Sequence, residues 1–70
     1  MITVYSKPNC VGCNEAKSLL ELNNVPYKVV DIFEDMAAME TLVTLGLKSV
    51  PQIFKDGVYV GGLDKLKQMF

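Results

Sequence analysis

Residues 2–22 read ITVYSKPNCVGCNEAKSLLEL, which is a strand pattern, a turn and a helix pattern in succession. Ile2–Ser6 alternates and is rich in β-formers, so it predicts a strand. Lys7–Asn9 contains a proline and predicts a turn. From Val11 a helical pattern begins, because small and apolar residues recur at spacings of three and four, at Cys13, Ala16 and Leu20. Two cysteines therefore lie where the first strand passes into the first helix.

The rest of the chain continues this alternation. Three further strands are predicted, at Tyr27–Ile32, Gln52–Phe54 and Val58–Val60. A helix is expected at Met36–Leu45, with Asp35 as its N-cap and Gly46 as a left-handed residue after its end. A last helix follows Gly61-Gly62, with one face formed by Leu63, Leu66 and Phe70.

The order β-α-β-α-β-β-α predicts an α/β fold. A strand–helix–strand unit crosses over right-handed and gives a parallel pair. Asp56-Gly57 is typical of the tight turn of an antiparallel hairpin, which would join the last two strands. We therefore expect a four-stranded mixed sheet flanked by helices on both faces.

The composition and net charge of the chain argue against several classes of function. The chain has 70 residues, enough for one domain at residues 1–70, and a net charge of −1. It lacks the clustered positive charge of nucleic-acid binders. Its apolar runs are too short for a membrane span, and its start does not resemble a secretory signal. We expect a cytoplasmic protein.

The cysteine pair is the candidate reactive group. The chain has two cysteines and no histidine, so Cys–His and Ser–His nucleophile pairs are excluded. Cys10 falls at a helix N-terminus, where free N–H groups, the helix dipole and nearby Lys7 stabilise a thiolate. Cys13 lies one turn further on the apolar face. We interpret Cys10 as the nucleophile and Cys13 as the resolving thiol, and we expect Gly12 to leave one flank of the site open.

Two other interpretations of the pair are weaker. A structural zinc ion needs four ligands, and a single chain offers two, so only a dimer sharing both pairs could complete such a site. Inert core cysteines are also conceivable, but Cys10 follows a polar turn at a helix end. The strand–helix–strand context favours redox chemistry.

Four segments in this order resemble the glutaredoxins, the compact branch of the thioredoxin fold. They are Val4–Lys7, Cys10–Cys13, Ser49–Phe54 and Gly61–Asp64. The resemblance covers essentially the whole chain. It implies a thioredoxin fold and a glutathione-dependent thiol–disulfide oxidoreductase that acts on protein disulfides and glutathione mixed disulfides through a redox-active Cys10–Cys13 disulfide, without a required metal.

The resemblance also implies a glutathione site. It predicts a cis peptide bond before Pro51, with the backbone of Val50 free to pair with glutathione. The N–H groups near Gly62 and Leu63 would hold the γ-glutamyl carboxylate. Asp64 would accept a hydrogen bond from the glutathione ammonium group, and Lys7 would pair with the carboxylate at the glycine end.

The chain departs from the family pattern at the same site. Many glutaredoxins have Pro-Tyr between the cysteines, where this chain has Val11-Gly12. Ser49 replaces the usual Thr before Val-Pro, and Lys65 follows Asp64 where a second acid is usual.

These departures keep two alternatives open. The protein could be a glutaredoxin-like donor reduced by thioredoxin reductase. In a different class, Cys10 and glutathione could hold an iron–sulfur cluster between two subunits. For the leading interpretation the expected partners are glutathione and disulfide-containing or glutathionylated proteins, with ribonucleotide reductase as a candidate client, and the expected state is a monomer.

Overall fold

The computed structural model describes all 70 residues and confirms the predicted order of elements. The strands are β1 (Ile2–Ser6), β2 (Tyr27–Asp31), β3 (Gln52–Lys55) and β4 (Val58–Gly61). The helices are α1 (Val11–Leu22), α2 (Met36–Thr44) and α3 (Leu63–Gln68). The start of α1 and the boundaries of β1, β2, α2, β3 and β4 differ from the sequence prediction by a residue or less. None of the three helices has the length and apolar character that a membrane span requires.

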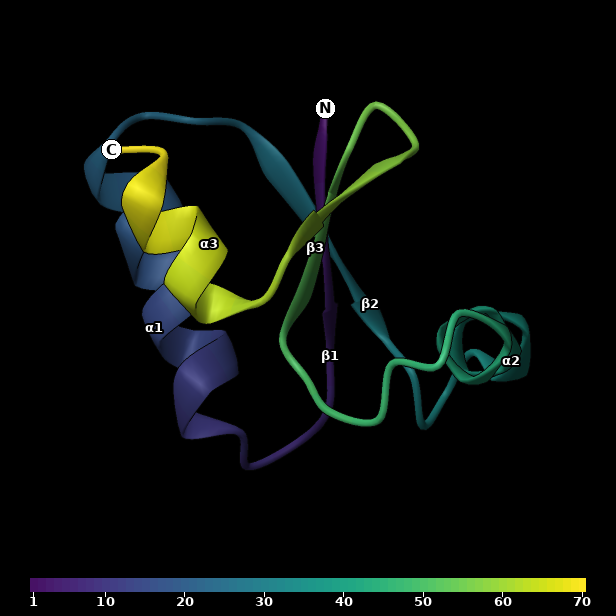
Figure 1. Cartoon of the computed structure of the whole chain (residues 1–70). Helices are drawn as coiled ribbons and strands as arrows, with labels where there is room; N and C mark the ends of the chain where they lie inside the picture. Colours follow the sequence, from purple (N-terminus) through teal and green to yellow (C-terminus); the bar gives the residue numbers. More distant parts are fainter.

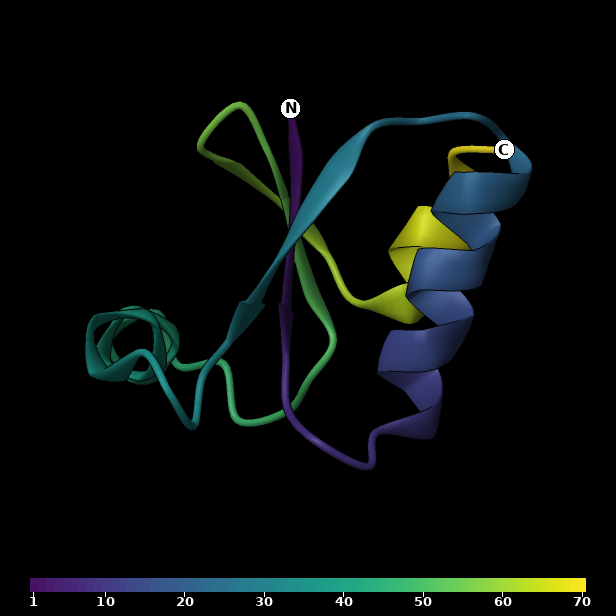
Figure 2. The ribbon, with the colours of Figure 1, turned by 180° about the vertical axis from the view of Figure 1, so that it is seen from behind.

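The four strands form one mixed sheet in the order β2-β1-β3-β4. β1 and β2 are parallel, whereas β3 runs antiparallel to both β1 and β4. Helices α1 and α3 lie together on one face of the sheet and α2 lies alone on the other (Figure 1). The reverse view shows the same three layers (Figure 2). The predicted four-stranded mixed sheet with helices on both faces is confirmed.

The structure confirms the predicted hairpin turn, the predicted N-cap of α2 and the predicted left-handed residue after α2. Asp56 and Gly57 both have positive φ, 51° and 81°, which matches the twist of a two-residue hairpin turn. Asp35 caps α2, because its carboxylate accepts a hydrogen bond of 3.1 Å from the N–H of Ala38. Gly46 adopts φ 75° just after α2 and lets the chain leave the helix.

The sheet separates two apolar clusters of unequal size. The larger cluster joins the sheet to α1 and α3 and contains six buried residues: Ile2, Val4, Ala16, Leu20, Ile53 and Leu66. The smaller cluster, on the side of α2, contains three: Ile32, Ala38 and Leu42. Successive side chains of a strand point to opposite faces, so Val4 enters the larger cluster while Tyr5 packs against the smaller one.

The predicted face of the last helix is wrong at one position. Leu66 is fully buried and Leu63 is half-buried, as expected. Phe70 is 50% exposed, because α3 ends at Gln68 and the chain has left the helix before it reaches Phe70. Helical spacing therefore no longer applies there.

Candidate active site

Cys10 is the N-cap residue of α1, as the sequence predicts. Its backbone is extended, with φ −109° and ψ 108°, and its carbonyl accepts the first helical hydrogen bond, from the N–H of Asn14 at 3.1 Å. Its sulfur accepts a hydrogen bond of 3.1 Å from the N–H of Cys13. The sulfur thus occupies the place where a side-chain oxygen caps many helices. This geometry favours negative charge on the Cys10 sulfur when the pair is reduced.

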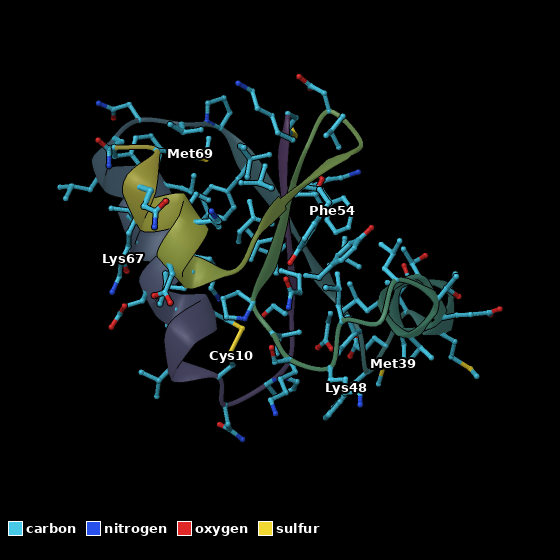
Figure 3. All side chains as sticks on the ribbon, viewed as in Figure 1. Cys10, Met39, Lys48, Phe54, Lys67 and Met69 are labelled. Atoms are coloured by element: carbon cyan, nitrogen blue, oxygen red, sulfur yellow. A yellow bond between two sulfur atoms is a disulfide. The ribbon has the colours of Figure 1, made fainter.

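Cys10 and Cys13 form a disulfide, with their Cα atoms 5.2 Å apart. Figure 3 shows Cys10 at the N-terminal end of α1. Cys13 is 1% exposed, whereas Cys10 is half-buried and is the more exposed residue of the pair. This difference in burial is the one expected if Cys10 reacts first with the substrate and the buried Cys13 then attacks the mixed disulfide on Cys10.

The segment before β3 lies beside the cysteines. The Val50–Pro51 peptide bond is cis, as the resemblance predicted. The carbonyl oxygen of Val50 is 3.8 Å from the Cys10 sulfur. Neither the N–H nor the C=O of Val50 has a backbone hydrogen-bond partner. A half-buried residue therefore presents one free donor and one free acceptor next to the reactive sulfur.

The expectation that Gly12 leaves one flank open is wrong. A Cβ atom at position 12 would lie 3.2 Å from the Cδ of Pro51 and 3.9 Å from a methyl carbon of Leu63. Pro51 is buried and fills this flank. The proline ring packs closely against Gly12, so a larger side chain at position 12 would press against Pro51 unless the ring shifted.

The N-terminus of α3 completes this end of the molecule. A Cβ atom at Gly62 would lie 3.5 Å from the carbonyl oxygen of Pro51, so the start of α3 lies beside the segment before β3. Gly62 is the N-cap of α3, and no side chain caps its first turn. Asp64 is exposed in that turn and forms no ion pair. Leu63, the first helical residue, is half-buried.

Gly61 packs against the side chain of Lys65. Its φ of 145° lies in a region that favours glycine, and a Cβ atom there would lie 2.5 Å from the Cγ of Lys65. The stem of Lys65 thus packs over Gly61. The glycine is explained by this internal contact.

Lys7 is exposed, forms no ion pair and lines a groove together with Val50. The structure therefore gathers the predicted residues at one end of the sheet, with α3 on one side of Cys10 and Lys7 on the side of α2. No group of three His, Cys, Asp or Glu side chains is placed to bind a metal ion within the chain.

Sequence reasoning missed a buried hydrogen-bond chain next to the site. Gln52 is 6% exposed, and its amide nitrogen donates to the carbonyl oxygen of Ser49 at 2.9 Å. The hydroxyl of Tyr59 donates to the amide oxygen of Gln52 at 2.7 Å. The one signal in the sequence is a polar residue at the start of an apolar strand.

A cysteine pair at a helix N-terminus, beside a free backbone segment on this sheet, is the arrangement typical of thiol–disulfide oxidoreductases of the thioredoxin fold. The family model described as Glutaredoxin matches residues 2–60. The chain belongs to the glutaredoxin family.

Two relatives are matched over most of their length. Glutaredoxin 3 of Escherichia coli (strain K12) is 35% identical over 66 residues, which cover 93% of this chain and 80% of that protein. The glutaredoxin-like protein NrdH of Lactococcus lactis subsp. cremoris (strain MG1363) is 32% identical over 62 residues, covering 89% and 86%. The chain spans only 29% of the hybrid peroxiredoxin hyPrx5 of Haemophilus influenzae and 50% of Glutaredoxin-C4 of Arabidopsis thaliana.

Solved structures agree on the fold. The thioredoxin-like protein BC3987 superposes with a TM-score of 0.82 at 36% identity, covering 100% of both chains. A complex of buckwheat glutaredoxin with glutathione also gives 0.82, at 25% identity, covering 96% of this chain and 64% of that one. The NrdH-redoxin of Escherichia coli gives 0.85 at 21% identity, covering 99% and 93%, which shows the shared fold alone.

Proposed function

We propose that the protein is a glutathione-dependent dithiol reductase of protein disulfides and glutathione mixed disulfides. The observation that carries the proposal is the free N–H and C=O of Val50 beside the Cys10 sulfur, at 3.8 Å for the carbonyl. An extended peptide that pairs with Val50 would bring its own cysteine sulfur to Cys10.

The order in which the two cysteines react follows from their exposure, because Cys10 is more exposed than Cys13. The Cys10 thiolate attacks one sulfur of the substrate disulfide, a mixed disulfide forms, and the other substrate sulfur leaves as a thiolate that takes up a proton. The Cys13 thiolate then attacks the Cys10 sulfur. This closes the Cys10–Cys13 bridge and releases the second substrate thiol. Two electrons and two protons reach the substrate for each bridge formed.

Glutathione would reverse the last step. One glutathione thiolate opens the bridge and forms a mixed disulfide on Cys10, and a second releases it as glutathione disulfide. In the bound tripeptide the cysteine backbone would pair with Val50, next to the buried Pro51. The γ-glutamyl end would reach Gly62, Leu63 and Asp64, and the glycine carboxylate would reach Lys7. The buckwheat complex with glutathione supports the ligand class.

The decisive experiment compares two reducing systems. The oxidised protein receives a small mixed disulfide and NADPH, with glutathione and glutathione reductase in one reaction and thioredoxin reductase alone in the other. We expect turnover with glutathione, and we expect Cys10→Ser to abolish it. Asp64→Asn should raise the KM for glutathione, while the matched charge change Glu40→Gln on α2 should not. Turnover in the thioredoxin reductase reaction and none in the glutathione reaction would overturn the glutathione assignment.

A second candidate is a glutaredoxin-like donor that thioredoxin reductase reduces. It is favoured by Gly12, which stands where many glutaredoxins have tyrosine, so the site lacks the aromatic wall that tyrosine supplies there. The similarity to the NrdH of Lactococcus lactis also points this way. The same two-system assay separates the candidates.

The proposal also covers the oligomeric state, the compartment and the client of the protein. We propose that residues 1–70 work as one domain, because both apolar clusters pack on the same sheet. We also propose that the protein acts as a monomer. A dithiol reductase requires a compartment that keeps thiols reduced, which the cytoplasm does. Ribonucleotide reductase is a proposed client.

A further inference from the structure

An apolar groove opens beside the reactive sulfur, on the face of the sheet that carries α2. Its volume is about 430 Å³, and its apolar wall comes mainly from Phe33, Met39, Val43 and Leu47. Phe33 and Val43 are more than 60% exposed. Figure 3 shows Met39 and Lys48 on this side of the molecule. Exposed apolar side chains that gather in a groove are typical of a surface that binds a partner.

The charges of the groove have one sign. Lys7 and Lys48 line it, and no acidic side chain does. Neither lysine forms an ion pair within the chain. A carboxylate is the natural complement of this rim, and an apolar side chain is the complement of the wall.

The groove is continuous with the site of the reaction, because Val50 belongs to both. Val50 lines the groove, and its carbonyl oxygen lies 3.8 Å from the Cys10 sulfur. A substrate chain that pairs with the Val50 backbone would place its cysteine at Cys10 and a neighbouring side chain over the groove, because side chains of an extended chain alternate in direction. Glutathione has no apolar side chain and would leave the wall formed by Met39 and Val43 uncovered.

We propose that this groove selects protein clients, by binding an extended segment that carries an apolar side chain and a carboxylate close to the reactive cysteine. The proposal rests on the dithiol reaction proposed above and adds the class of client. The apolar side chain covers Val43 and Met39, and the carboxylate pairs with Lys7 or Lys48.

The test uses four peptides, each a disulfide-linked homodimer of one sequence. Beside the cysteine they carry Leu or Ser at one position and Glu or Lys at another. The protein is first reduced with dithiothreitol, freed of it, and mixed with each peptide in a single turnover. Formation of the Cys10–Cys13 bridge accompanies release of two peptide thiols, so the electrons balance without glutathione.

We expect the peptide with Leu and Glu to react about tenfold faster than the one with Ser and Lys, since burying part of a leucine side chain supplies such a factor. Lys48→Gln should reduce the preference for Glu and keep the preference for Leu. Val43→Glu should remove the preference for Leu. The matched control is Val58→Glu, at an equally exposed valine on β4 outside the groove, and it should keep both preferences.

Each contrary outcome has a distinct meaning. Equal rates for all four peptides, or equal effects of Val43→Glu and Val58→Glu, would overturn the groove proposal. If sedimentation shows a dimer that Val43→Glu dissociates without changing peptide preference, the groove binds a second copy of this chain and the client assignment is wrong. Since the assay contains no glutathione, a failure of glutathione dependence leaves this result intact. A protein that turns over glutathione mixed disulfides but shows no peptide preference refutes only the groove proposal.

Discussion

Replacing Gln52 with Leu would remove the hydrogen-bond chain behind the segment that presents Val50. The amide of Gln52 donates to the carbonyl oxygen of Ser49 at 2.9 Å and accepts from the hydroxyl of Tyr59 at 2.7 Å. Ser49 directly precedes Val50. We therefore interpret Gln52 as a positioning residue, which holds the free backbone groups of Val50 at the Cys10 sulfur.

The size of the effect can be worked out from the partners. Each lost hydrogen bond costs about 0.5–1.5 kcal/mol. Ser49 is exposed and Tyr59 is 43% exposed, so water can reach the groups left unpaired. We expect a loss of about 1–2 kcal/mol in the free energy of unfolding. In a domain of this size each kcal/mol lowers Tm by about 4–8 °C.

A measurement of enzymatic activity separates a positioning role of Gln52 from a role in stability alone. At 25 °C, where the variant is still folded, we expect Gln52→Leu to lower kcat/KM for a glutathione mixed disulfide by about threefold to tenfold, mainly through KM, which corresponds to roughly one hydrogen bond. The stability control is Val60→Ala, which removes apolar contacts with the larger cluster. It should lower Tm and leave kcat/KM unchanged.

Two results would refute this reasoning. If Gln52→Leu lowers Tm while kcat/KM stays within twofold of the parent, the residue is structural only. If the effects of Gln52→Leu and Tyr59→Phe simply add in the double variant, the two side chains do not act as one unit, because members of a hydrogen-bonded chain show a coupling energy.

Three further predictions concern the cysteines, the glycine pair and the core. Cys13→Ser should still reduce glutathione mixed disulfides but should accumulate a covalent adduct of Cys10 with protein disulfides, which mass spectrometry detects; rapid release without an adduct would contradict the resolving role. Gly61→Ala should destabilise by about 1–3 kcal/mol in urea unfolding, because of its φ of 145° and the contact with Lys65, and an unchanged midpoint would contradict that strain. Leu66→Ala should cost about 2–5 kcal/mol by the same measurement, because Leu66 is fully buried, and a loss below about 1 kcal/mol would mean that the site collapses around the cavity.

The fold was largely predictable because its signals are local. The alternation in Ile2–Ser6, the turn pair Asp56-Gly57 and the capping residue Asp35 each act within a few residues, and the structure confirms all three. The position of Cys10 followed from the same kind of signal, since a helix start can be located from the pattern that follows it. Phe70 was misplaced because periodicity does not report where a short helix ends.

The rest of the site depends on contacts between segments far apart in sequence. Nothing near Gly12 announces that Pro51 will fill its flank, and nothing near Gln52 shows that its amide will reach Ser49 and Tyr59. The predicted Val50 and Pro51 contacts came from family resemblance. The groove was invisible for the same reason, because its wall and its lysines meet only after α2 packs against the sheet.

The unequal apolar clusters imply that the two faces of the sheet open with different ease. α2 is anchored through the cluster of Ile32, Ala38 and Leu42, whereas α1 and α3 share a cluster twice that size. Segments with few buried apolar contacts exchange their amide hydrogens through local openings of low free energy. The amides of α2 should therefore exchange with solvent before those of α1. The same helix forms one wall of the groove beside Cys10, so the surface that meets a client would be the more deformable half of the molecule, while the helix that holds the sulfurs stays rigid.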